Sequence, residues 1–299
     1  MSPAGAATEA IGRLARLAVR ARLDGPLLEL CAGVLHRAPH VRAARSLGWH
    51  LGEAAGPRAR VARLRGGARM LVDVRDYAHR SAFLYGVYEE DVTRLVHRIA
   101  TPGWTVLDVG ANAGYFALVA AAAGGTGAQV VAFEPNPRML DLLEQTLRRN
   151  PGAPVELVAA ACGDRAGSVA LHLSPDPRNS GLSTVLESFE NAEAIEVASL
   201  RLDEFCAHRA IVPDLVKVDV EGAEEIVLRG AEGLLREATP THVICEVWAA
   251  SREPLGDYMG SLGYAAYAIG SDGALEPARA TDGCWDNICF RHERAGAAG

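Results

Sequence analysis

The chain has 299 residues, of which 49% are hydrophobic and 22% are charged, and its formal net charge is −7. This is the composition of one large globular domain with an extension. The acidic balance excludes the global basic field that attracts nucleic acid. In addition, no apolar run approaches the roughly 20 residues that a membrane-spanning helix needs.

Two features of the sequence favour a cytoplasmic protein. Arginines interrupt the apolar residues between Ile11 and Leu23, so this segment lacks the apolar core of a signal peptide. The six cysteines are scattered and none forms a C-x-x-C pair, which argues against a zinc site or a disulfide framework. They are Cys31, Cys162, Cys206, Cys245, Cys284 and Cys289.

Residues 1–60 are predicted to form a helical extension. Ile11, Leu14 and Leu17 keep helical spacing with arginines between them, and Pro26 begins a second apolar segment. A basic amphipathic helix could touch a membrane or a partner, and these helices could also mediate a homo-oligomer. A helical cap packed on the following domain is the simpler interpretation.

Residues 61–299 are predicted to form one α/β domain. Apolar and polar residues alternate on both sides of Gly66-Gly67, which predicts a hairpin over residues 60–76. A helix is expected to follow from Glu89 to Ala100. Strands that alternate with helices then indicate a parallel sheet covered on both faces. The extended segments are 105–109, 129–133, 155–161, 168–173, 195–202, 215–220 and 241–247, and the helices are 113–123, 137–149, 223–237 and 255–262.

The last two strands, 265–269 and 287–291, are joined by a polar loop that leaves no room for a crossover helix, so they should pair antiparallel. The whole pattern predicts a Rossmann-like, mostly parallel sheet of seven strands with an antiparallel last strand. We also expect Asp203 to cap a short helix, and the polar stretch 174–191 to be a functional loop.

The apolar strand 105–109 ends in a glycine turn. Asp108, Gly110 and Gly114 form a D-x-G-x-x-x-G pattern, and the helix after it begins with free N–H groups and a positive dipole end. The dinucleotide fingerprint G-x-G-x-x-G has a middle glycine that admits a pyrophosphate, and this glycine is missing here. Asp108 would repel a diphosphate but could meet a cation. The pattern therefore favours S-adenosylmethionine (SAM), which carries an ammonium and a sulfonium, over NAD.

Acids also follow the other predicted core strands. Glu134 comes directly after strand 129–133, where a carboxylate can accept both ribose hydroxyls of a nucleoside; a solvated carboxylate is the alternative. In sheets of this kind the ligand lies outside the carboxyl ends of the strands. The residues at these ends are Asp108, Gly110, Glu134, Asp164, Asp219 and Glu246.

The segment 216–222 alternates valine with charge. The valines fall on one face of a strand, and Lys217, Asp219 and Glu221 fall on the other. Burying three charges is costly unless they pair or serve a function, and a structural Lys–Asp ion pair is the alternative interpretation. Lys217 is the single lysine among the 30 basic residues, which suggests a position where a compact ammonium is needed and a planar guanidinium would not fit.

In this order the motifs resemble the FkbM-type SAM-dependent methyltransferases. The resemblance covers about Val72 to Arg291 and leaves residues 1–60 unexplained. It implies a class I methyltransferase fold with SAM as cofactor. It also implies methylation of a hydroxyl on a small molecule, either a sugar or a secondary metabolite. The matching segments are 88–89, 106–115, 133–137, 200–203, 216–224, 230–231, 245–247 and 286–288.

The resemblance also implies which residues hold SAM. Glu134 would hold the ribose, Asp164 would accept from the adenine amino group, and the methionine end would lie near Asp108. The full set of implied cofactor contacts is Glu89, Asp108, Gly110, Asn112, Gly114, Glu134, Asn136 and Asp164.

Transfer to an alcohol needs a base that takes the hydroxyl proton, and Asp219 and Glu221 are the candidates. Lys217 would orient one of them or the acceptor oxygen. His172 is an outside candidate, because a lone histidine on a short strand is more often structural.

Two other functions and one metal site stay open as alternatives. A non-catalytic SAM- or nucleoside-binding module would keep Asp108 and Glu134 without methyl transfer, and an NAD-dependent oxidoreductase is disfavoured by the missing glycine. Asp219 and Glu246, at adjacent strand ends, could hold a magnesium ion that grips a substrate diol. Carboxylates at strand ends commonly hold no metal, and no Asp-Asn ligand pair follows. The sequence therefore favours a site without a metal ion.

Overall fold

The structure is a computed structural model that describes residues 3–21, 24–38, 41–56, 59–176, 178–186, 193–237, 240–277 and 285–292. Arg22, Cys284 and the loop residues 187–191 therefore lie outside the described residues. By its internal contacts the chain divides into two compact units. The first is Met1–Tyr88 with Arg148–Asn150 and Asp176–Ser180, and the second is Glu89–Leu147 with Pro151–Pro175 and Gly181–Gly299. The domain boundary expected after residue 60 stays a prediction.

The first unit contains the N-terminal helices, a hairpin and one further helix. Leu28, Leu35 and Leu51 are fully buried between the helices. Asp76 caps the last helix by accepting from the amide of His79 at 3.2 Å. The elements are α1 (Pro3–Arg20), α2 (Asp24–Leu35), α3 (Arg42–Ala54), the antiparallel pair β1 (Ala59–Arg63) and β2 (Arg69–Asp73), and α4 (Tyr77–Tyr85).

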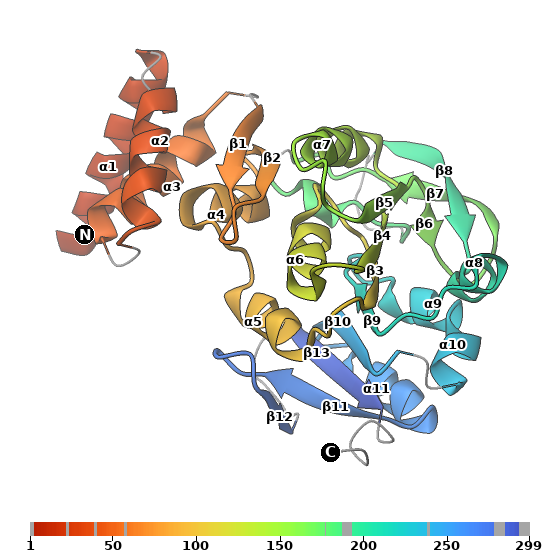
Figure 1. Ribbon diagram of the computed structural model, residues 1–299. Helices are drawn as coiled ribbons and strands as arrows, with labels where there is room; N and C mark the ends of the chain where they lie inside the picture. Colours follow the sequence, from red (N-terminus) through yellow and green to blue (C-terminus); the bar gives the residue numbers. More distant parts are fainter. Residues whose placement is uncertain are drawn as a thin grey trace. The chain divides into compact units, whose positions relative to one another are not determined.

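The second unit is built on an eight-stranded sheet with the order β12-β11-β13-β10-β9-β3-β4-β5 (Figure 1). All strands run parallel except β13 and β12, so the predicted parallel sheet with a late antiparallel strand is confirmed, and β12 adds one edge strand. The strands are β3 (Thr105–Val109), β4 (Gln129–Phe133), β5 (Val155–Val158), β9 (Leu215–Val218), β10 (His242–Trp248), β11 (Tyr264–Ile269), β12 (Leu275–Pro277) and β13 (Trp285–His292).

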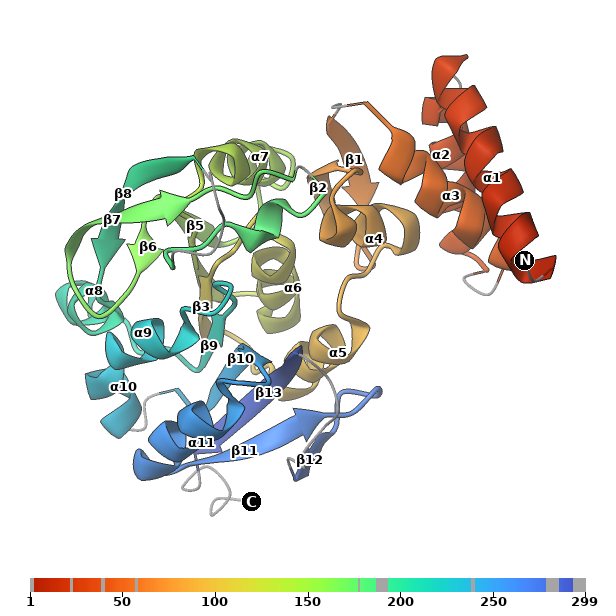
Figure 2. The ribbon, with the colours of Figure 1, turned by 180° about the vertical axis from the view of Figure 1, so that it is seen from behind.

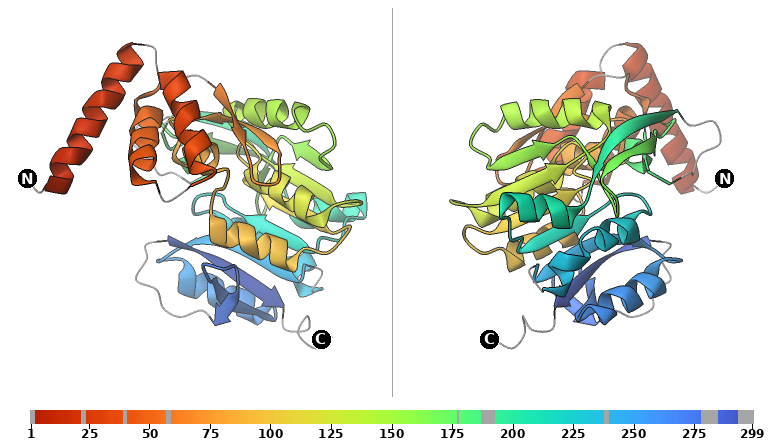
Figure 3. Two further views of the ribbon diagram at one scale, coloured as in Figure 1. Left: turned by 60° about the vertical axis from the view of Figure 1, so that its left-hand side comes forward. Right: turned by 90° about the vertical axis from the view of Figure 1, so that its right-hand side faces the viewer.

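Helices cover both faces of this sheet, which is the Rossmann-like α/β arrangement. α5, α6 and α7 lie on one face and α8 to α11 on the other (Figure 2), and the same layers can be followed in the side views of Figure 3. The helices are α5 (Glu90–Ile99), α6 (Tyr115–Gly124), α7 (Pro137–Arg148), α8 (Leu202–Arg209), α9 (Glu224–Arg229), α10 (Glu232–Arg236) and α11 (Arg252–Ser261).

The register of the strands assigns their side chains to the two faces. Val109, Val218 and Cys245 are aligned across β3, β9 and β10, and they are buried in the apolar core together with residues of α8 to α11. Because side chains alternate along a strand, the neighbouring residues Asp108 and Lys217, which are also aligned with each other, point to the opposite face. The polar residues of the sheet therefore gather on the face that carries α6.

Three expectations are corrected by the structure. The strand expected over 155–161 ends at Val158, and the chain then forms a separate three-stranded sheet of β6 (Ala161–Cys162), β8 (Ala194–Leu200) and β7 (Gly167–His172). The helix expected over 223–237 breaks into α9 and α10 at Gly230. A Cβ at Gly230 would lie 1.9 Å from the carbonyl oxygen of Gly163, so close backbone packing requires a glycine at this break.

Asp203 is the third correction. It lies within the first turn of α8, so it is not the cap of that helix. Its carboxylate instead accepts from the amides of Gly233 and Leu234, at 3.1 and 3.0 Å, which are free donors at the start of α10. The residue is a capping residue, as its type suggests, but for a different helix.

No helix within the described ranges is long and apolar enough to cross a membrane. The five cysteines within these ranges are free and buried. Burial raises the pKa of the Cys206 thiol to about 11. They behave as core thiols, as the sequence predicts.

Candidate functional site

The polar residues singled out in the sequence meet at the edge of the sheet where the parallel strands β3, β9 and β10 end. Asp108 and Lys217 are direct neighbours on β3 and β9. Two residues beyond Lys217, Asp219 follows β9 and lies at the level of Glu246 of β10, because Val218 is aligned with Cys245. Asn287 of β13 is paired with Glu246 in turn. This row of side chains is where an α/β sheet binds its ligand.

The glycine turn after β3 is required by packing. Gly110 has φ +82°, and a Cβ added there would lie 1.8 Å from the carbonyl oxygen of Asp219. Gly114 has φ +93°, and its Cβ would meet Leu143 at 2.4 Å. A side chain at either position would therefore overlap atoms of the protein, and the expected approach of a ligand to these glycines stays a prediction.

Glu134 is held by the same turn. Its carboxylate accepts from the amides of Asn112 and Asn136, each at 2.8 Å, so each oxygen keeps a further acceptor site. The side chain is buried, and burial raises the pKa of Glu134 to about 7, although the two amide bonds oppose this rise.

Asp108 is an isolated buried carboxylate. It is 1% exposed, and neither oxygen has a hydrogen-bond partner of normal geometry among the described residues. Burial raises the pKa of Asp108 to about 6; nearby Lys217 and the amide of Ala117 counteract this rise. A buried carboxylate in this condition favours a neighbouring cation.

Lys217 is that neighbouring cation, and its ammonium contacts both a carboxylate and an aromatic ring. Its Nζ donates to Oδ2 of Asp219 at 2.7 Å and lies 4.3 Å from the ring centroid of Phe116 in α6. Its side chain is 4% exposed. Burial alone would lower the pKa of Lys217, but the surrounding carboxylates, Asp219 first, raise it, so the ammonium is charged.

Glu221 reaches the site through a left-handed turn. β9 ends at Val218, and Glu221 has φ +56°, an uncommon value for a residue with a side chain. Two side chains hold the turn. The carboxylate of Glu224 accepts from the amide of Gly222 at 3.1 Å, and the hydroxyl of Thr184 donates to the carbonyl of Glu221 at 3.0 Å.

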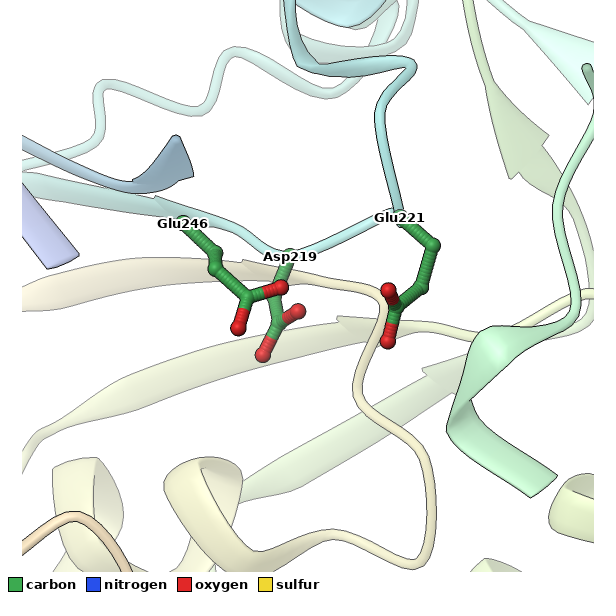
Figure 4. Close-up of side chains that lie close together, drawn as sticks. All are labelled: Asp219, Glu221 and Glu246. Atoms are coloured by element: carbon green, nitrogen blue, oxygen red, sulfur yellow. The ribbon is translucent and has the colours of Figure 1, made fainter. Parts of the chain in front are cut away.

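Glu246 completes a cluster of three carboxylates. One oxygen each of Asp219, Glu221 and Glu246 lies within 4.8 Å of the others. Figure 4 shows that the three side chains point toward the same space from β10, from the end of β9 and from the turn that follows. Burial, with repulsion from Asp219 and Glu221, raises the pKa of Glu246 to about 9.

The other predicted site residues lie around this centre. Glu89 directly precedes α5 with φ +40° and contributes to the raised pKa values of Lys217 and Glu246. Asn136 uses its amide within the protein: Oδ1 accepts from the amide of Arg138 as the cap of α7, and Nδ2 donates to the hydroxyl of Ser183 at 3.2 Å.

Two predicted residues lie in the three-stranded sheet. Asp164 follows β6, is half-buried, and its carbonyl accepts from the guanidinium of Arg201 at 2.6 Å. His172 ends β7, where its backbone exchanges two hydrogen bonds with Thr184. For neither residue does a described contact join its side chain to the carboxylate cluster.

Sequence reasoning missed several residues that support the site. The signal for Glu224 is visible, because an acid two residues after Gly222 can cap the free amides of a turn. Ser183 and Thr184 belong to the polar loop that was expected to be functional, but their partners could not be named. The position of Asn287 depends on a pairing between distant strands.

The fold and the row of acids at its carboxyl edge define a Rossmann-like α/β enzyme site. The family model described as "Methyltransferase FkbM domain" matches residues 108–262. The chain belongs to the FkbM methyltransferase family, and the resemblance seen in its motifs is confirmed.

Two characterised proteins are similar to this chain. Hexuronic acid methyltransferase AglP of Haloferax volcanii is 34% identical over 162 residues, which cover 54% of this chain and 63% of AglP, less than two thirds of its length. Methyltransferase sdnD of Sordaria araneosa is 30% identical over 177 residues, covering 49% of this chain and 67% of sdnD.

Among solved structures, a methyltransferase FkbM from Methylobacillus flagellatus matches 92% of this chain and 60% of its own, with 17% identity and a TM-score of 0.46. A SAM-dependent methyltransferase from Agrobacterium tumefaciens matches 80% of this chain and 71% of its own, with 14% identity and a TM-score of 0.45.

Proposed function

We propose that this methyltransferase uses SAM and transfers its methyl group to a hydroxyl of a sugar or secondary metabolite. The observation that carries the proposal is the juxtaposition of two sets of groups at one edge of the sheet. Asp108 and Glu134 offer acceptors for a cationic nucleoside, and Lys217, Asp219 and Glu221 offer a base beside them.

The cofactor end is supported by the chemistry of its donor and acceptor atoms. SAM has no phosphate, and the turn between Gly110 and Gly114 lacks the middle glycine that admits a pyrophosphate. The second acceptor site of each Glu134 oxygen suits a pair of ribose hydroxyls. The carboxylate of Asp108, whose oxygens have no hydrogen-bond partner of normal geometry among the described residues, suits the methionine ammonium. Asn112, Asn136 and Asp164 stay proposed contacts.

The acceptor end is supported by the carboxylates beyond Lys217. Bound SAM supplies an electrophilic methyl group, whose transfer leaves the C–S electron pair on a neutral sulfur. Asp219 or Glu221 takes the proton of the acceptor hydroxyl as the new C–O bond forms. Lys217, held by Asp219 at 2.7 Å, fixes the orientation of that carboxylate.

The acceptor class is inferred from the family and from one relative. AglP is named for a hexuronic acid, so an acidic sugar is the first acceptor to test, followed by neutral glycosides and natural-product alcohols. Methylation of a hydroxyl is the reaction that a carboxylate base supports best, because alcohols must lose a proton during transfer.

The test is transfer of labelled methyl from SAM to a panel of these acceptors by the full-length protein. We expect labelled product with at least one class. Asp219→Asn should lower kcat about 100-fold or more, the usual contribution of a positioned base. Asp257→Asn, on the exposed face of α11, is the matched control and should not change turnover. Equal turnover in the two variants would remove Asp219 from the mechanism.

A further inference from the structure

We propose that Asp219, Glu221, Glu246 and Asn287 form a binding site for a hard divalent cation of the Mg²⁺ or Ca²⁺ class. The sequence argued against a metal here, partly because no Asp-Asn ligand pair follows the strand. The structure supplies an asparagine from another strand, because Asn287 of β13 is paired directly with Glu246 of β10.

Asn287 is the observation that distinguishes this cluster from an ordinary acidic surface. The residue is 8% exposed, and its Oδ1 is buried without a hydrogen-bond partner among the residues that the structure describes. Side chains of directly opposed residues in an antiparallel pair project from the same face, so Asn287 lies on the face of the sheet from which Glu246 projects. A buried amide oxygen left without a partner is costly unless a ligand meets it.

The spacing of the carboxylates fits an ion of this class. Two oxygens on opposite sides of an ion are separated by twice the metal–oxygen distance, which is about 4.1 Å for Mg²⁺ and about 4.6 to 5.2 Å for Ca²⁺. One oxygen each of Asp219, Glu221 and Glu246 lies within 4.8 Å of the others. This upper bound is compatible with both ions. All four ligands are oxygens, which favours Mg²⁺, Mn²⁺ or Ca²⁺ over zinc.

Charge and access agree with this assignment. Three carboxylates converge here, and the ammonium of Lys217 binds Oδ2 of Asp219. A divalent ion among the three would add positive charge where negative charges gather. Asp219, Glu221 and Glu246 are partly exposed, which leaves room for water or for an acceptor oxygen on the ion. A role in holding the acceptor hydroxyl rests on the proposed function, whereas ion binding does not.

The test is a titration of the full-length protein with Mn²⁺, followed by loss of the electron paramagnetic resonance signal of the free ion, without SAM or acceptor. We expect one bound ion per chain. Glu246→Gln and Asn287→Leu should weaken the affinity by about 10- to 100-fold. Asn287→Asp, which keeps an oxygen ligand, should retain it, and Glu225→Gln, on the exposed side of α9, is the matched surface control.

The outcomes separate this site from its alternatives. Absence of Mn²⁺ binding at millimolar concentration in the folded wild type would overturn the proposal. The three carboxylates would then be stabilised by shared protons or by the positive charge of SAM. If Asn287→Leu bound Mn²⁺ as tightly as the wild type, Asn287 would not be a ligand, and the proposed site would be overturned. Methyl transfer is not needed for either readout, so failure here and failure of the proposed function are distinguishable.

Discussion

Replacement of Lys217 by methionine is the perturbation whose effect follows most directly from the structure. The substitution removes the ammonium at similar length and leaves Asp219 and the buried Asp108 without their cation. Breaking a buried ion pair on one side costs about 3–5 kcal/mol. The side chain of Asp219 is 23% exposed and can turn toward water, so we expect a loss near the lower end, about 3 kcal/mol at pH 8.

The loss should depend on pH with a defined sign. Lys217 lowers the pKa of Asp108, which is already raised to about 6, so the variant raises that pKa further above its unfolded value. A group with a raised folded pKa binds its proton in the native state, so the variant's stability relative to wild type falls as pH rises through and above 6. At pH 5 protonated Asp108 needs no cation, and the difference should shrink.

Urea unfolding of both proteins at pH 5 and pH 8 measures this difference. Lys217→Arg is the companion variant, because it keeps the charge. We expect it to fold with a loss of about 1–3 kcal/mol from overpacking against Phe116, and to lose about 100-fold in kcat. A loss below about 1 kcal/mol in Lys217→Met at both pH values, as for an exposed ion pair, would refute the reasoning.

Three further predictions follow from single contacts. Thr184→Val should lower kcat about fivefold at unchanged SAM affinity, because the carbonyl of Glu221 loses a hydrogen bond worth about 1 kcal/mol, and Thr184→Ser should restore it. Gly110→Ala should lower the free energy of unfolding by more than about 3 kcal/mol, because its Cβ would lie 1.8 Å from a carbonyl oxygen. Gly66→Ala, with a similar φ and open space around it, should lower it by about 1–2 kcal/mol. Equal losses on thermal unfolding would contradict this. SAM affinity should fall as pH drops below about 7, when Glu134 is protonated, and stay constant above it; a flat calorimetric profile would argue against ribose binding by this residue.

Local patterns predicted the part of the fold that holds the site. The strands expected at 105–109 and 129–133 have these bounds in the structure, because each is a short apolar run closed by a glycine or proline turn. The breaks and caps were not predictable in the same way. At the interruption, Gly230 packs closely on the backbone of the distant Gly163, and the capping partner of Asp203 lies on a helix 30 residues away.

The residues of the site also fall into those that local patterns predict and those that depend on contacts between distant segments. Asp108, Glu134 and Asp219 could be identified because each follows or ends a core strand, and parallel strands end at one edge. Alternation along the strand also anticipated that Lys217 would lie on the side of Asp219. The positions of Thr184 and Asn287 depend on loop closure and strand pairing over long separations, which periodicity does not encode.

Calorimetric titration with SAM tests the central claim most directly. We expect one SAM per chain, no binding of NAD, and a loss of about 1–3 kcal/mol in Glu134→Ala, which removes charge-assisted hydrogen bonds to the ribose. Glu144→Ala, on α7 outside the site, should bind as the wild type does. Binding of NAD in place of SAM, or SAM affinity unchanged in Glu134→Ala, would contradict the account.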